Sequence, residues 1–243
     1  MDAALDADGL RTRIAGLFDE LAALRGPHWR EGLTVVAVSK TVGSAAVRVA
    51  ASAGVTDFGE NRVQELVKKG TELGDLAVRW HLIGHLQTNK VKAALDFAGI
   101  IHSVDSLKVA LEIDARARSA GRAERFPVLL EVNVSGEASK GGFAPRDVGP
   151  AIDELARRDE GEPLAIEVAG LMTMAPFTDE EAVLRGTFRG LRELRDALAA
   201  RGERFVRAVH LSMGMSNDYR IAVEEGATLI RVGTRLFAAE ARG

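Results

Sequence analysis

Residues Leu33–Lys40 read LTVVAVSK, and this stretch decides the fold class. Five of its first six residues are apolar, and three of these are valines. A continuous apolar run that is rich in β-branched residues is typical of a strand buried on both faces, as in a parallel sheet. The stretch therefore predicts a buried strand that ends in a lysine.

The lysine at the end of this strand is chemically unusual, because burying an ammonium group without a partner costs free energy. Strand alternation places Lys40 on the same face as Thr34, Val36 and Val38. If that face lines a barrel, the amine lies at its mouth, where desolvation would favour the neutral, nucleophilic form. Two interpretations stay open: a lysine that forms a Schiff base with a carbonyl compound, or a strand-end lysine that reaches solvent.

Composition narrows the class of protein. The chain has 243 residues, near the typical length of one (β/α)₈ barrel. Its net charge of −3 does not indicate a nucleic-acid or membrane partner, and the absence of cysteine excludes disulfides and thiol catalysis. The N-terminal stretch lacks a signal-peptide core and no run is apolar enough to span a membrane, so we expect a cytoplasmic protein.

Hydrophobic periodicity predicts eight strands that alternate with helices, behind an amphipathic helix from Leu5 to Arg25. This alternation implies a parallel sheet, and eight units in this length imply closure into a barrel. The predicted fold is α/β, a single-domain TIM barrel over residues 1–243 with an extra N-terminal helix. The strands are expected at 33–40, 57–60, 78–84, 100–104, 128–134, 165–174, 209–213 and 228–232, and the helices between them at 44–53, 61–70, 88–97, 106–120, 147–158, 179–201 and 218–225.

Two loops at strand ends have the composition of a phosphate site. The seventh strand is followed by SMGMSND (212–218), and the eighth by Gly233-Thr234. Hydroxyls, small residues and exposed backbone N–H groups suit phosphate, and these two loops are its recurrent site in TIM barrels. Strand eight closes the barrel beside strand one, so a phosphate there would neighbour Lys40. A phosphate beside a nucleophilic lysine indicates pyridoxal phosphate, while ordinary loop chemistry remains the alternative.

Arg231 shares strand parity with Gly233 and is predicted to point inward beneath it. A guanidinium there could donate to the ring nitrogen of pyridoxal phosphate, and because arginine holds its proton, the ring would be a weak electron sink. The alternative is an arginine paired with an inward acid such as Glu131. Asn61, at the end of the second strand, could bond the ring hydroxyl or cap the next helix.

His81 and His85 are four residues apart, but no glutamate lies between them and the context is a strand. We therefore expect packed or hydrogen-bonded histidines and no metal site.

Taken together, these motifs resemble the pyridoxal-phosphate homeostasis family, the YggS/PROSC proteins. The similarity covers nearly the whole chain, and the order and spacing of the motifs make it specific. The motifs are AVSKT (37–41), FGENRVQE (58–65), WHLIGHLQTNK (80–90), HSVDS (102–106), EVNVSGEASKGG (131–142), GLMTM (170–174), LSMGMSNDY (211–219) and IRVGTRLF (230–237).

The resemblance implies an alanine-racemase-type barrel, fold type III of the pyridoxal-phosphate proteins. It implies that Lys40 holds the cofactor as an aldimine, with Asn61 near the cofactor and Arg231 near the ring nitrogen. One departure is Phe237-Ala238-Ala239, because the family usually has a glycine after the phenylalanine. The implied phosphate-binding positions are Ser212, Gly214, Ser216, Gly233 and Thr234.

The resemblance also implies a carrier of pyridoxal phosphate that buffers the cofactor, influences amino-acid and keto-acid pools, and lacks robust catalysis of its own. The main alternative is an amino-acid racemase, which needs an acid/base on each face of the Cα. Lys40 can serve one face, but the only tyrosine is Tyr219, beside the phosphate loop. We therefore expect a monomeric carrier that delivers cofactor to apo-enzymes, and we assign no catalytic residue. A Lys40 aldolase acting on a sugar phosphate is a remote third possibility.

Overall fold

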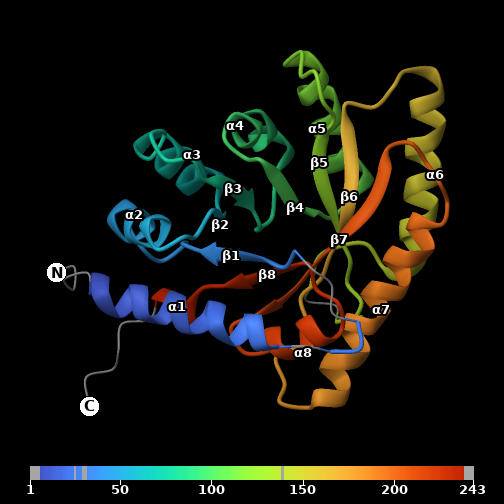
Figure 1. Ribbon diagram of the computed structural model, residues 1–243. Coiled ribbons are helices and arrows are strands. Elements are labelled where there is room, and N and C mark those ends of the chain that lie inside the picture. The colour runs from blue at the N-terminus through green and yellow to red at the C-terminus, as the bar shows by residue number, and fades with distance from the viewer. Residues whose placement is uncertain (1–5, 25, 29–31, 138–139, 238–243) are drawn as a thin grey trace.

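The computed structural model describes residues 6–24, 26–28, 32–137 and 140–237. Within these residues the chain forms a closed barrel of parallel strands that follow one another in sequence order (Figure 1). The predicted TIM barrel is confirmed. The strands are β1 (Thr34–Val38), β2 (Asp57–Glu60), β3 (Arg79–Leu82), β4 (Ile100–Val104), β5 (Phe126–Glu131), β6 (Ile166–Met172), β7 (Val206–Met215) and β8 (Leu229–Val232).

Helices cover the outside of the barrel, and Figure 1 shows α1 lying along the side formed by β8 and β1. No helix among the described residues is long and apolar enough to cross a membrane. The helices are α1 (Ala7–Ala23), α2 (Ser44–Ser52), α3 (Val63–Glu72), α4 (Val91–Leu95, after a 3₁₀ turn at Thr88–Lys90), α5 (Leu107–Ser119), α6 (Pro145–Gly161), α7 (Glu181–Ala199), α8 (Tyr219–Glu224) and α9 (Thr234–Phe237).

The extra N-terminal helix forms as its periodicity predicts. The Asp6 side chain caps α1 by accepting a hydrogen bond from the Gly9 N–H at 2.9 Å. The leucines and isoleucine of one face are buried, and each such burial stabilises the fold by roughly 1.5–3 kcal/mol. The predicted ends of this helix, Leu5 and Arg25, lie outside the described residues. The buried face consists of Leu10, Ile14, Leu17 and Leu21.

Alternation along the strands separates two cores. Ala37 on β1 belongs to the large core between strands and helices, whereas Val36 belongs to a small cluster inside the barrel. Val36 is in register with Arg231 on β8, so Arg231 also points inward. The inner cluster contains Val36, Ile100, Leu129, Ala169, Met172 and Leu229.

Candidate functional site

Lys40 lies two residues beyond β1, at the carboxyl end of the barrel, and its side chain is exposed. The loop after β8 packs on the same strand end, because a Cβ on Gly233 would lie 3.3 Å from the Val38 carbonyl oxygen. The structure therefore places the Gly233 loop beside the strand end that leads to Lys40. Lys40 sits in a turn rather than in the strand and is exposed, so of the two interpretations left open the structure has the lysine that reaches solvent.

The loops after β7 and β8 meet at Ser216. Its Oγ accepts hydrogen bonds from the backbone N–H of Gly233 at 3.3 Å and from that of Arg235 at 3.5 Å. Thr234 lies between these two donors and is exposed. Backbone N–H groups that converge on one oxygen are the donor set that binds phosphate in many proteins. This geometry fits the predicted phosphate site at Ser216, Gly233 and Thr234.

Gly214, the penultimate residue of β7, fixes the path of the chain into the first of these loops. Its φ of 91° lies in the left-handed region, and a Cβ there would come within 2.6 Å of the Ala222 Cβ on α8. Asp218 supports the same turn, since its Oδ1 accepts from the Met215 N–H at 2.5 Å. The loop is therefore packed tightly on α8, with no room for a side chain at Gly214.

Ser212 requires a correction. Its hydroxyl oxygen accepts a hydrogen bond from Arg231 Nη1 at 2.6 Å and lies 2.9 Å from His102 Nδ1, inside the barrel. The side chain has no exposed surface. Because β7 continues to Met215, Ser212 lies within the strand rather than in the loop. The prediction that its hydroxyl binds phosphate is not retained.

Arg231 is held from two sides beneath the mouth. Its Nη1 donates to Ser212, and its Nη2 donates to the Thr173 carbonyl oxygen at 2.9 Å. Burial lowers the pKa of Arg231 to about 10, so the guanidinium stays charged at neutral pH. The Glu131 alternative is not seen, because no carboxylate among the described residues forms an ion pair with Arg231. Asp218 and Glu131 act on Arg231 only through space and raise its pKa.

Asn61 directly follows β2 and is partly buried. Helix α3 begins later than predicted, and its N-cap is Arg62, which makes no side-chain capping bond. The capping role of Asn61 is therefore wrong. Its backbone is fixed instead by Gly84, where a Cβ would lie 2.3 Å from the Asn61 carbonyl oxygen. Contact between Asn61 and a cofactor stays a prediction.

A buried histidine pair was not predicted. His81 Nδ1 lies 2.9 Å from His102 Nε2, and His81 Nε2 lies 2.8 Å from Asp57 Oδ1. The hydrogen-bonded role expected of His81 is confirmed, and His85 bonds Asp105 at 2.9 Å. In the described part of the chain, no group of three or more histidine, cysteine or acidic residues could hold a metal. Inward parity on neighbouring strands was the sequence signal for the pair.

Comparisons with known proteins identify the relatives of this chain. Residues 19–241 match the family model described as the N-terminal domain of alanine racemase. The chain is 43% identical over 203 residues to the pyridoxal phosphate homeostasis protein of Aquifex aeolicus, covering 84% of this chain and 85% of the relative. It is 42% identical over 233 residues to the protein of that name from Pseudomonas aeruginosa, covering 95% and 94%.

Solved structures show the same barrel. PipY of Synechococcus elongatus with pyridoxal phosphate bound matches with a TM-score of 0.81 and 35% identity, over 94% of this chain and all of that one. Alanine racemase of Clostridium difficile matches with a TM-score of 0.72 over 96% of this chain and 56% of that one, but at 16% identity, which supports the fold alone. Fold and site thus define an alanine-racemase-type barrel. Within this class, the chain belongs to the pyridoxal phosphate homeostasis protein family.

Proposed function

We propose that this chain binds pyridoxal phosphate at the carboxyl end of its barrel and acts in homeostasis of that cofactor, as a buffer and carrier. The observation that carries the proposal is the meeting of two phosphate-type loops at Ser216, beside the strand end that leads to Lys40. The relatives bear the corresponding name, and PipY was solved with the cofactor bound.

The residues at the mouth fit the parts of this cofactor. Backbone N–H groups of Gly233 and Arg235 now converge on the Ser216 hydroxyl, and they would serve phosphate oxygens together with Gly214 and Thr234. Pyridoxal phosphate supplies an aldehyde, which condenses with a primary amine with loss of water. Lys40 would provide that amine, and a bound ring would cover its exposed side chain.

Arg231 favours storage over catalysis. Its guanidinium is charged and already fixed by Ser212 and the Thr173 carbonyl. A group that only donates needs a lone pair on its partner, so it favours an unprotonated ring nitrogen, and an unprotonated ring is a weak electron sink. Asn61 would complete the site from the end of β2.

Tyr219 does not supply the second acid/base that a racemase needs. It is buried, and its hydroxyl donates to Glu20 Oε1 on α1 at 2.5 Å, on the outside of the barrel. Burial and the bond to Glu20 raise the pKa of Tyr219, so its proton is held more firmly. This contact favours the carrier over the racemase.

The cofactor has to pass from this protein to the enzymes that use it. An exposed Lys40 favours exchange with competing amines, and we propose apo-enzymes that use pyridoxal phosphate as recipients. We further propose that residues 1–243 act as one domain in the cytoplasm and that the protein is a monomer. Size-exclusion chromatography with light scattering would test the monomeric state.

The function is tested by titrating the purified protein with pyridoxal phosphate and, separately, with pyridoxal, while following absorbance. We expect saturable binding of the phosphate and at least tenfold weaker binding of pyridoxal, because only the phosphate engages the loop N–H groups. The holo-protein is then mixed with an apo-enzyme and assayed for its reactivation, beside a chiral assay for racemisation. Equal affinity for both compounds, or alanine racemisation that disappears in Lys40→Ala, would contradict the proposal.

A further inference from the structure

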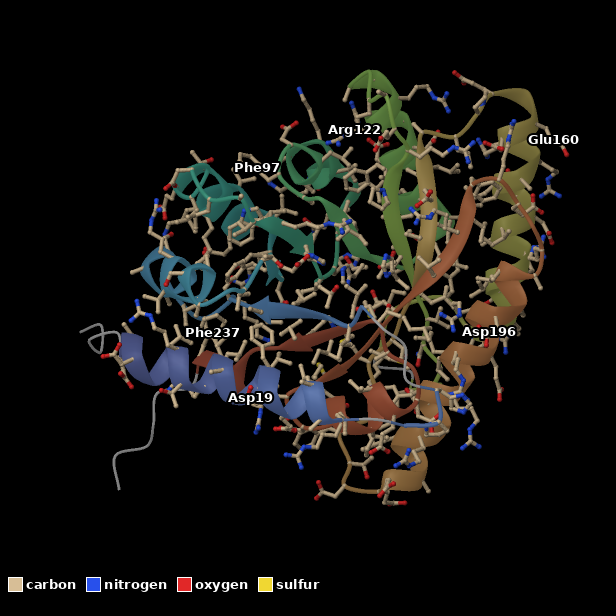
Figure 2. The ribbon with its side chains drawn as sticks, viewed as in Figure 1. Asp19, Phe97, Arg122, Glu160, Asp196 and Phe237 are labelled. Atoms are coloured by element: carbon tan, nitrogen blue, oxygen red, sulfur yellow. The ribbon has the colours of Figure 1, made fainter. Side chains whose placement is uncertain are left out.

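A linear chain of hydrogen bonds, here called the file, runs through the inside of the barrel from Asp57 to Arg231. Figure 2 draws the side chains of the barrel. Asp57 Oδ1 lies 2.8 Å from His81 Nε2, and His81 Nδ1 lies 2.9 Å from His102 Nε2. Ser212 Oγ then lies 2.9 Å from His102 Nδ1 and 2.6 Å from Arg231 Nη1. His81, His102 and Ser212 have no exposed surface, so water does not reach the bonds that join these three side chains.

The two ends of the file are chemically fixed. Arg231 has only donors, so Ser212 Oγ must accept from it. Asp57 stands at the other end, where burial alone would raise its pKa, but hydrogen bonds from His81 and Thr56 hold that pKa below its usual value. An ionised carboxylate only accepts, so His81 carries its proton on Nε2.

The histidines between these ends are neutral, because burial lowers the pKa of His81 and lowers that of His102 much further. A neutral imidazole has one donor and one acceptor nitrogen. His81 Nδ1 must then accept from His102 Nε2–H, and His102 Nδ1 must accept from the Ser212 hydroxyl. Every proton in the file points from Arg231 toward Asp57.

Resting on the function proposed above, we propose that Asp57 is a positioning residue for Arg231: its carboxylate sets the direction of the whole file, so that His102 accepts the Ser212 hydroxyl proton and the Ser212 oxygen stays turned toward the guanidinium. If the direction were reversed, His102 would donate to Ser212, whose oxygen can accept from both His102 and Arg231, but the buried Ser212 hydroxyl proton would lose its acceptor. The group that faces the cofactor ring at one end of the barrel is thus held by a carboxylate at the other.

Solvent reaches the Asp57 end. Asp57 lines a cavity of about 690 Å³ among the amino ends of the strands, together with Arg79, Asp96, Phe97 and Arg122. Phe97 and Arg122 are labelled in Figure 2. Water in this cavity favours the ionised carboxylate on which the direction depends. Asp96 lines the same cavity without joining the file, so it offers a matched control.

The direct test is ¹⁵N NMR of the cofactor-free protein at pH 7, with histidine signals assigned by single His→Gln variants. We expect both His81 and His102 as neutral Nε2–H tautomers. Asp57→Asn replaces a carboxylate that only accepts by an amide that can also donate to His81 Nε2, so it frees the direction and should change the signals of both histidines. Asp96→Asn should leave both unchanged. A wild-type His102 protonated on Nδ1 would overturn the proposal. The same signals for His102 in Asp57→Asn and in the wild type would also overturn it.

A second readout connects the file to the cofactor. Asp57→Asn should weaken binding of pyridoxal phosphate about tenfold and shift its bound absorption band, because the Ser212 hydroxyl that accepts from Arg231 is no longer held in one orientation. Asp96→Asn should do neither. If Asp57→Asn and Asp96→Asn bind pyridoxal phosphate with equal affinity and equal absorption spectra, Asp57 does not position Arg231. If the wild-type protein binds no pyridoxal phosphate, the proposed function fails, while the tautomers still decide the direction of the file.

Discussion

Lys69 Nζ on α3 lies 2.7 Å from Glu60 Oε1 at the end of β2, and both side chains are almost fully buried, with 3% and 0% exposed. The Ser39 hydroxyl donates to the same Glu60 oxygen at 2.6 Å, and Lys69 donates to the Ser39 carbonyl at 2.7 Å. These bonds close a ring behind the strand end that carries Lys40. The turn that presents the proposed cofactor lysine is therefore tied to α3 and β2.

Removing one partner of this pair should be strongly destabilising. Lys69→Met leaves the Glu60 carboxylate buried without its cation, and we expect the free energy of unfolding to fall by about 3–5 kcal/mol in urea denaturation. Adding Glu60→Leu to Lys69→Met should restore much of the loss. The exposed pair Arg48–Asp75 is the matched control, and Arg48→Met should change stability little. Equal small losses in Lys69→Met and Arg48→Met would show that the buried pair does not stabilise the fold.

The phosphate loop should not tolerate a side chain at Gly214. Gly214→Ala would place an alanine in the left-handed backbone region and bring its Cβ against Ala222. We therefore expect the free energy of unfolding to fall by at least about 1 kcal/mol, and binding of pyridoxal phosphate to weaken about tenfold. The control is Gly16→Ala on α1, where a Cβ has open space and should stabilise by roughly 0.5–1 kcal/mol. The measurements are thermal unfolding and a binding titration. Unchanged affinity in a folded Gly214→Ala protein would argue against this loop as the site.

Stability should fall on mild acidification because three histidines resist protonation in the folded protein. Burial lowers the pKa of His81 and His102, and it lowers that of His210 to about 4. The unfolded chain binds these protons near pH 6.5, so the contribution is complete above that pH and is lost as the pH falls below it.

Each such histidine lowers the free energy of unfolding by up to about 1.4 kcal/mol for each pH unit below 6.5, until the pH reaches its folded pKa. Burial raises the pKa of Glu131 and of Asp218, which act in the opposite direction, so a variant must isolate the histidine effect. Urea unfolding at pH 7.5 and 5.5 should show a smaller drop in His210→Gln than in the wild type. The same drop in both proteins would mean that His210 is not held neutral by the fold.

Much of the barrel could be predicted because strand alternation and helical periodicity are visible within short stretches of the sequence. Alternation groups Val36 with Lys40 on one face of its strand and Arg231 with Gly233 on one face of another, and in the structure Val36 and Arg231 point into the barrel. Element ends were less predictable, since capping and packing decide them. Helix α6 begins at Pro145, where proline suits the first turn, and not at Asp147.

The site was predictable in outline but not in its buried part. Local composition points to Ser216 and Gly233, and the two loops do meet there. The role of Ser212 depends on which hydroxyl the barrel turns inward, and on His102, 110 positions away in sequence. Such pairings arise from barrel closure and leave no local signal beyond parity. Ala238, where the chain departs from the family pattern, lies outside the described residues.

The central claim is that Lys40 holds pyridoxal phosphate at the mouth of the barrel. It is tested most directly by loading the protein with the cofactor, reducing it with borohydride and mapping the labelled peptide by mass spectrometry. We predict a phosphopyridoxyl group on Lys40, and no stable label at this peptide in Lys40→Ala. A label on another lysine, such as Lys90 or Lys140, or no label at all on a folded protein, would contradict the claim.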